Sequence, residues 1–167
     1  CFVRKSSDYQ VSSGALTALF RKLCGRIAQS KRLPEFWPQL SDRSLATILR
    51  AYFDGDGTVG YGGEGIAATA SKQLASDLAY ALKRFAIHAR LRTQWKRATN
   101  SSHHGAIYHY VVISGQDDLR RFAEAIGFDH PEKQARLESF RQRRADTNVD
   151  VVPIDRAVLR SLRVDLG

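Results

Sequence analysis

Two aspartates lie at the end of a predicted helix. Residues 49–57 read LRAYFDGDG, so that Asp54 and Asp56 alternate with glycines where the helical pattern stops. The carbonyl end of a helix carries about half a negative elementary charge, which makes each carboxylate there unfavourable by roughly 0.3–1 kcal/mol. The two acids therefore predict a cation nearby, usually a metal, because hard divalent cations prefer carboxylate oxygens.

The helix that positions these acids is predicted to start at Ser41 or Asp42, which are both good N-cap residues. Small residues at steps of four, namely Thr47, Ala51 and Gly55, form one of its faces. Small side chains at this spacing allow a second helix to approach closely. The helix also carries an apolar stripe that predicts burial against a core, made of Leu45, Ile48, Leu49, Tyr52 and Phe53.

Hydrophobic periodicity predicts the neighbouring elements. A helix is expected at 13–23, followed by a proline-containing connector at 31–38. Beyond the two aspartates, short strands are expected at 58–61 and 66–70, joined by a glycine-rich turn. Ser71 then has the position of an N-cap for another helix.

A second pair of strands is expected at 89–96 and about 107–114. Further helices are expected to start with Asp117 as a cap and with Pro131 in the first turn, the latter running to residue 144. The order from Ser41 is helix, two strands, helix, two strands, helix, helix. This order predicts an α+β fold, in which helices cover one face of an antiparallel sheet.

One face of the strand at 89–96 is basic and polar. Its members are Arg90, Arg92, Gln94 and Lys96. Arginine and glutamine make bidentate contacts to guanine and adenine edges in the major groove, and a β-ribbon can enter that groove. An ordinary solvated strand face is the alternative interpretation, since exposed strand faces are commonly polar.

The charge balance favours a polyanionic partner. Lysine and arginine number 26 against 17 acidic residues, a formal net charge of +9, so nucleic acid is expected first and an anionic membrane surface second. A soluble protein that is merely basic remains the alternative. No apolar run approaches the ~20 residues that span a bilayer. No secretory signal pattern is present, and the two cysteines have no metal spacing, so a cytoplasmic, reducing setting is expected.

The motif and the element order together resemble the LAGLIDADG homing endonucleases. The run from Asp54 to Gly57 matches the acidic end of the family motif, whereas Arg50 and Ala51 replace its small residues and Tyr52 and Phe53 its aliphatic pair. The resemblance covers about residues 41–137. It implies an αββαββα half-domain with a saddle-shaped antiparallel sheet.

The flanking sequences, KRLP at 31–34 and NVDVVP at 148–153, resemble those of the second repeat in archaeal-type intein endonuclease domains. Residues 1–40 are then expected to be the end of a preceding repeat plus a linker, 41–145 the endonuclease repeat, and 146–167 the start of a helical extension. Only one copy of the motif is found. Self-splicing is not expected, because the chain has neither a splicing nucleophile block at its start nor a terminal His-Asn.

The resemblance also implies residue roles. Asp56 would be the catalytic metal ligand, with Mg²⁺ or Mn²⁺ as cofactor, and Asp54 would help to pack paired helices and cap the turn. Lys133 occupies the place of the family's basic residue near the metal; a solvated lysine is the alternative. Gln94, Lys96 and Lys72 are rival candidates, and Lys72 is also expected to contact DNA.

The expected function is site-specific, metal-dependent cleavage of double-stranded DNA. A binding module without cleavage, such as a regulator or maturase, is the alternative, and a piece that is inert without its partner is a third possibility. Because one copy supplies one metal-binding carboxylate, a second repeat is expected, either in a homodimer or in a preceding half of the protein. The pairing face would comprise Thr47, Ala51, Asp54 and Gly55.

Overall fold

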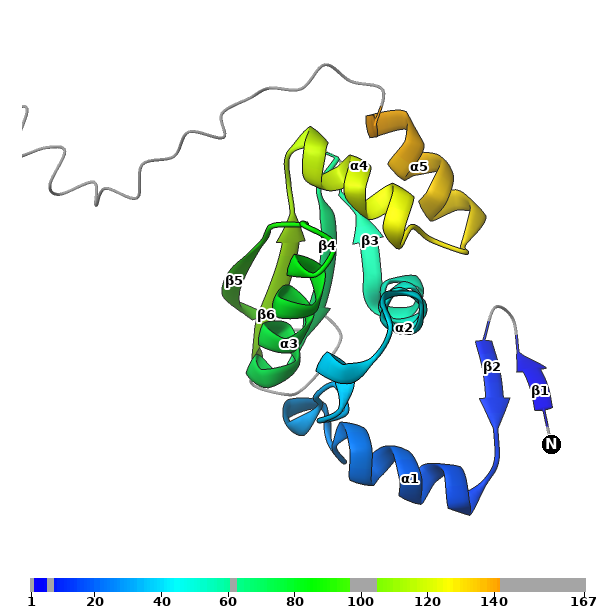
Figure 1. Cartoon of the computed structure of the whole chain (residues 1–167). Coiled ribbons are helices and arrows are strands. Elements are labelled where there is room, and N and C mark those ends of the chain that lie inside the picture. The colour runs from blue at the N-terminus through cyan, green and yellow to red at the C-terminus, as the bar shows by residue number, and fades with distance from the viewer. Residues whose placement is uncertain (1, 6–7, 61–62, 97–104, 142–167) are drawn as a thin grey trace, which may run out of the picture.

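A four-stranded antiparallel sheet forms the centre of the molecule, in the order β3-β4-β6-β5. In this computed structural model, residues 2–5, 8–60, 63–96 and 105–141 are described. The strands are β3 (Gly57–Val59), β4 (Gly65–Thr69), β5 (Ala89–Lys96) and β6 (Ala106–Ile113). The helices around them are α2 (Asp42–Asp56), α3 (Lys72–Lys83), α4 (Gln116–Ala125) and α5 (Pro131–Arg141). All four helices lie on one side of the sheet (Figure 1), so the α+β expectation is confirmed.

The core lies between the sheet and these helices. Phe53 of α2 is fully buried, and its ring centroid lies 4.9 Å from that of Phe122 in α4. Phe122 in turn lies 5.5 Å from Phe128, in the segment that enters α5. Burying a phenylalanine stabilises a fold by roughly 1.5–3 kcal/mol, so this aromatic group fixes the C-terminal half of α2 against α4 and α5.

Strand register separates a covered face of the sheet from an open one. Val111 of β6 pairs with Ala67 of β4 and Leu91 of β5, and both Val111 and Ala67 belong to the core. Neighbouring positions in a strand point to opposite faces. Tyr110 and its partner Arg92 therefore lie on the open face, away from the helices.

Side chains from α3 and from its two cap residues fix the chain that leads into α2. The Asp77 carboxylate accepts a hydrogen bond of 3.0 Å from the backbone N–H of Leu33, and the buried Ser71 hydroxyl donates to the carbonyl of Lys31. Arg84 donates to the carbonyl of Leu40 at 2.9 Å and forms an ion pair with Asp42. The start of the motif helix is thereby held against the same domain that holds its end.

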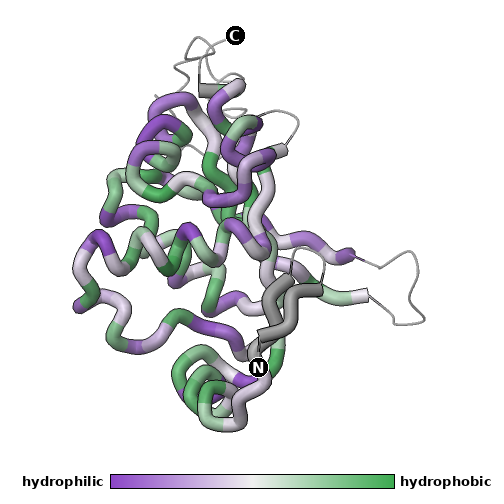
Figure 2. The backbone as a smooth tube through the Cα atoms, turned by 90° about the vertical axis from the view of Figure 1, so that its right-hand side faces the viewer, coloured by the Kyte–Doolittle hydropathy of each residue, from purple (hydrophilic) through white to green (hydrophobic). Residues whose placement is uncertain are grey.

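The N-terminal elements are the hairpin β1 (Phe2–Lys5) and β2 (Asp8–Val11), the helix α1 (Gly14–Cys24), and two 3-10 turns, η1 (Ala28–Ser30) and η2 (Trp37–Gln39). The hairpin was not predicted. Helix α1 was, and it has Ser13 as its N-cap and Gly25 at its end. None of its residues is buried: Leu16, Leu19 and Phe20 are all exposed. Figure 2 shows it as the helix at the bottom, with hydrophobic positions along its length.

The start of α4 differs from the prediction. Its N-cap is Gly115, at φ 104°, and not Asp117, because the positive φ lets the chain enter the helix directly from β6. Asp117 lies in the first turn, where its carboxylate pairs with Arg120 at 3.2 Å. The predicted strand boundaries agree within two residues. The end of the last predicted helix at 142–144 and the helical extension expected from residue 146 lie outside the described residues.

Candidate functional site

The end of α2 presents an exposed carboxylate. Asp56 is the last helical residue, and the last turn contains no basic residue. Gly57 follows because a Cβ there would lie 2.5 Å from the carbonyl oxygen of Phe53, too close for any side chain. Asp56 forms no ion pair with the part of the chain that the structure describes. Its oxygens are thus available to a ligand from outside this chain.

Tyr52, one turn before Asp56, had been counted only as part of the apolar stripe. Burial of its ring is the main cause that raises the pKa of the Tyr52 phenol to about 12; the negative charge of Asp56 adds to the rise, and a hydrogen bond with the Thr69 side chain opposes it. The hydroxyl donates to the carbonyl of Ala68 at 3.4 Å. Tyr52 is therefore a neutral donor close to the exposed acid.

Asp54 is bound within its own chain. Its two carboxylate oxygens each accept a hydrogen bond of 3.1 Å from the backbone N–H of Asp129, and one of them accepts another from His130 at the same distance. These amides immediately precede α5, where backbone donors lack helical partners and attract anions. Asp54 therefore joins the end of α2 to the start of α5, while its assignment to a helix-pairing face stays a prediction.

Lys133 lies at the carbonyl end of α2. Its ammonium donates to the carbonyl of Asp54 at 2.6 Å and to that of Phe53 at 3.4 Å. It also lies 5.9 Å from the centroid of the Phe128 ring. A cation at this place offsets the partial negative charge of the helix end. Lys133 is therefore not the solvated lysine of the alternative interpretation, although its role in catalysis stays a prediction.

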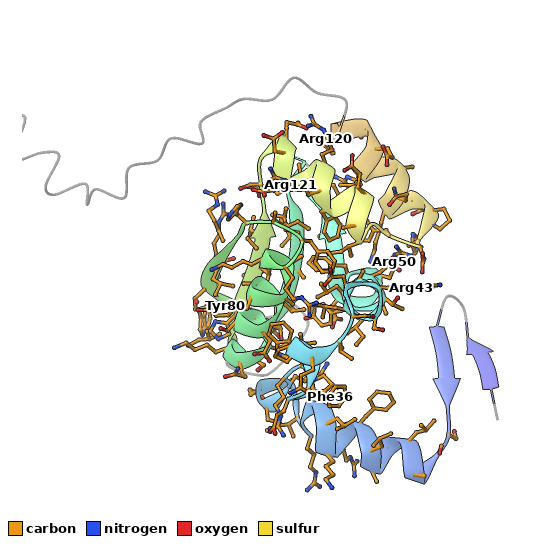
Figure 3. The ribbon with its side chains drawn as sticks, in the orientation of Figure 1. Phe36, Arg43, Arg50, Tyr80, Arg120 and Arg121 are labelled. Carbon is orange, nitrogen blue, oxygen red and sulfur yellow. The ribbon has the colours of Figure 1, made fainter. Side chains whose placement is uncertain are left out.

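Arg50 adds a third link between α2 and the segment before α5. Its guanidinium donates to the carbonyl of Ile126 and lies 3.4 Å from the Asp129 carboxylate. Figure 3 shows Arg50 between α2 and this segment. We call the side of α2 that carries Arg50 and Asp54 the bonded side.

The small-residue face of α2 is bare among the described residues. Thr47, Ala51 and Gly55 are exposed, and a Cβ built on Gly55 would meet no atom within 4 Å. The Thr47 hydroxyl donates back to the Arg43 carbonyl in its own helix at 2.9 Å. We call these three residues the bare side. Among the described residues, these three positions are open to the surroundings of the molecule.

A groove of about 720 Å³ runs beside the end of α2. It is bounded by α1, by the connector into α2 and by the start of α3, and Tyr52 and Asp56 lie on its wall. Leu16 and Phe20 of α1 also line it. The groove shows that the approach to Asp56 is open and partly apolar.

The open face of the sheet gathers the predicted nucleic-acid contacts. In β5, Ala89 is half-buried and the other seven residues are exposed, among them Arg90, Arg92, Gln94 and Lys96. A hollow of about 520 Å³ lies on this face, lined by Ile66, Arg92, Thr93, Gln94, Tyr110 and Val112. The Lys96 ammonium stands 5.0 Å from the Tyr110 ring centroid, a cation–π distance. Cationic, amide and aromatic groups thus meet on one concave surface.

Lys72 is placed apart from this group. It is the first residue of α3, is exposed, and belongs to the layer of helices on the covered side of the sheet. Its expected contact with DNA stays a prediction, and the structure does not bring it together with β5.

Sequence reasoning missed one acid on the open face. Glu64 precedes β4, and its Oε1 lies 3.8 Å from Arg90 Nη2 and 3.6 Å from Arg92 Nη2. The available signal was strand parity, because Glu64 and Ile66 are two residues apart and therefore share a face. The pairing across β6 could not be read from local sequence.

At the end of α2, Asp56 is the carboxylate that could contribute to a metal site. No group of three or more His, Cys, Asp or Glu side chains suited to a metal occurs within residues 2–5, 8–60, 63–96 and 105–141. The donor chemistry of Asp56 suits a hard divalent cation, which also accepts water and phosphate oxygens as ligands. Among the described residues, Asp56 by itself supplies too few ligands to enclose a metal ion.

The fold and this site together define an α+β half-domain with an exposed face on α2 and a basic, open sheet face. The chain belongs to the LAGLIDADG family: the model of the LAGLIDADG-like domain matches residues 44–127. Domains of this family bind DNA, pair as dimers or as repeats, and are typically nucleases that use divalent metals.

Several curated proteins with unrelated names are similar to this chain. It is 34% identical over 161 residues to the replication factor C small subunit of Methanocaldococcus jannaschii, covering 95% of this chain and 8% of that protein. It is 31% identical over 152 residues to elongation factor 2 of Methanopyrus kandleri, covering 90% and 11%. It is 35% identical over 121 residues to the replicative DNA helicase DnaB of Synechocystis, covering 66% and 13%. The chain thus spans a small part of each relative.

Among the helices that the structure describes, none has the length and apolar character needed to cross a bilayer.

Proposed function

We propose that this chain is one half of a site-specific endonuclease that cleaves double-stranded DNA with the help of a divalent metal. The observation that carries the proposal is the exposed carboxylate of Asp56, which has no ion pair among the described residues and lies beside the bare side of α2. Pairing two such helices would bring two carboxylates together. At about 4 Å their repulsion is ~4 kcal/mol at an effective dielectric constant of 20, and shared cations offset it.

The proposed roles follow from the chemistry of phosphodiester hydrolysis. Asp56 and its counterpart from the second repeat hold Mg²⁺ or Mn²⁺, and a bound metal neutralises phosphate charge and lowers the pKa of the attacking water. Lys133, already at this helix end, stabilises negative charge that develops on the phosphate. Arg90, Arg92, Gln94 and Lys96 contact the duplex from the open face of the sheet.

We also propose that the natural setting is a mobile insertion of the intein type. The relatives carry three different names: a replication factor C small subunit, an elongation factor 2 and a replicative DNA helicase. A module that inserts into different host proteins explains why one short segment recurs within them.

The test is the substitution Asp56→Asn, which keeps the side-chain shape and removes the charge. Substituting residues that only support metal ligands lowers activity by about 10–100-fold, so loss of a direct ligand should lower metal-dependent cleavage by at least a hundredfold. Binding to duplex DNA should remain. The matched control is Asp117→Asn on the exposed start of α4, which should cut like the unaltered chain. Equal cutting by both variants would place the active carboxylate elsewhere.

A binding module without cleavage is the second candidate, favoured by the single copy of the motif. Both candidates require DNA affinity that falls with salt, at a log–log slope of about −0.9 per phosphate neutralised. A flat response would reject both. The enzyme is supported if the unaltered chain cuts a duplex library in the presence of a divalent metal and Asp56→Asn abolishes this cutting.

A further inference from the structure

Glu64 is a negative charge on the surface that the proposed function gives to DNA. Its side chain is 32% exposed, whereas those of Arg90 and Arg92 are 63% and 56% exposed. An anion on a phosphate-binding surface is unfavourable for binding, because it repels the ligand. Its presence between the two arginines therefore needs an explanation.

The three side chains reach one another across β6. Arg90 pairs in register with Val112 of β6, which pairs with Ile66 of β4, and Glu64 lies two residues before Ile66 on the same face. Val112 is only 1% exposed although it is on the open face. The two guanidinium groups come within ion-pair range of Glu64 although β6 separates β5 from β4, so the long arginine side chains extend across β6.

The contacts are of the kind that can be exchanged. At 3.6 and 3.8 Å the charged atoms are within ion-pair range but beyond hydrogen-bond length. Arg90 is held by a second partner as well, since its Nη2 donates to the Ser114 hydroxyl at 2.9 Å. A guanidinium has five N–H donors, so that donors of Arg92 stay available to the hollow on this face.

We propose that Glu64 is a specificity-determining residue, which directs Arg90 and Arg92 towards neutral acceptors on base edges and away from phosphates. This inference rests on the proposed function. A guanine edge offers uncharged acceptors that an arginine can bind while it stays paired with a carboxylate. A phosphate that approaches the same arginine meets the negative charge of Glu64. Sequence-independent binding is weakened more than base recognition.

The experiment compares the chain with Glu64→Gln, using a random-sequence DNA duplex as the probe. The substitution removes the charge and keeps the shape, and it leaves the hydrogen bond from Gly60 N–H to the Glu64 carbonyl in place. We expect duplex affinity to rise about fivefold at low salt, the size of an exposed charge interaction. The salt slope should steepen by about 0.9 for each arginine that gains a phosphate. When bound duplexes are selected from a randomised pool, the Glu64→Gln variant should enrich its preferred sequences less strongly than the unaltered chain does.

The matched control is Glu124→Gln on the exposed surface of α4, which changes the net charge equally. Equal tightening by both variants would overturn the inference, because it would show an effect of net charge alone. An unchanged affinity and slope for Glu64→Gln would also overturn it, while salt-dependent binding by the unaltered chain would leave the proposed function standing. Absence of salt-dependent binding by the unaltered chain would reject the proposed function itself.

Discussion

Two neighbouring sides of α2 are used in different ways. On the bonded side, Asp54 accepts hydrogen bonds from the backbone before α5, and Arg50 donates to the carbonyl of Ile126. On the bare side, Thr47, Ala51 and Gly55 are exposed, and Gly55 has open space where a side chain would be. Residues 50 and 54 each precede a member of the bare side by one position, so about 100° of rotation separates the two sides.

Under the proposed function, α2 is both a structural element and an interface. The bonded side fixes the rotation and tilt of α2 within its own domain, with Lys133 holding the carbonyl end. The bare side gives no stability to the single chain, since its residues contact little. Substitutions on the first side should therefore change folding, and those on the second should change pairing.

The largest effect on folding is expected for Asp54→Ala. The substitution leaves two backbone N–H groups without their charged acceptor. Hydrogen bonds to charged groups contribute about 1.5–3 kcal/mol each in favourable cases, so the free energy of unfolding should fall by about 2–3 kcal/mol. Urea denaturation followed by circular dichroism measures this.

Asp129→Ala is the control for that experiment. It removes an exposed carboxylate that has one ion pair, with Arg50 at 3.4 Å, and it keeps the backbone N–H that Asp54 accepts. An exposed pair is worth about 0–1 kcal/mol. If both variants lost the same stability, the bonded side would have no special role in orienting α2.

A smaller effect, confined to association, is expected for Ala51→Leu. Overpacking a close interface costs roughly 1–3 kcal/mol, which corresponds to pairing that is weaker by about fivefold to a hundredfold. The stability of the single chain should change by less than about 0.5 kcal/mol because the site is exposed. Sedimentation equilibrium over a range of concentrations measures self-association. Glu124→Leu places a leucine on the exposed surface of α4 and should leave association unchanged. If both variants weakened association equally, the bare side would not be the interface.

Local sequence signals predicted the elements well and the partners of their side chains poorly. Ser41 and Ser71 marked helix starts because an N-cap satisfies donors only three residues away. Strand β5 was predicted with its correct bounds from alternation alone. The acceptor role of Asp54 depends on amides 75 and 76 residues later in the chain. No periodicity in the sequence encodes such a contact.

The candidate site divides in the same way. Asp56 stood out because a charge at a helix end is a local conflict, visible in nine residues of sequence. Glu64 did not stand out, since its partners Arg90 and Arg92 come from a strand that is separated from β4 by β6. The N-cap of α4 was predicted at Asp117, but it is Gly115, because β6 ends two residues before Gly115 and the chain turns there with a positive φ. Where a strand ends is set by its pairing and is not visible in the local sequence.

The smallest effect is expected at Tyr52, whose pKa lies at about 12, raised first by burial and then by the charge of Asp56. In the unfolded chain the phenol ionises near pH 10, so its contribution to stability is complete below about pH 10 and is lost as the pH rises to about 12. The free energy of unfolding should decline by less than the ~1.4 kcal/mol per pH unit expected for one proton on a fully buried group, because the ring is only half-buried. Tyr52→Phe should make urea midpoints fall less steeply over this range, whereas Tyr80→Phe, at a ring that is 60% exposed, should not. If the pH dependence of the urea midpoint were the same for Tyr52→Phe and the unaltered chain, the phenol would be hydrated in the folded state. The groove beside Asp56 would then be as open to water as the exposed bare side of α2.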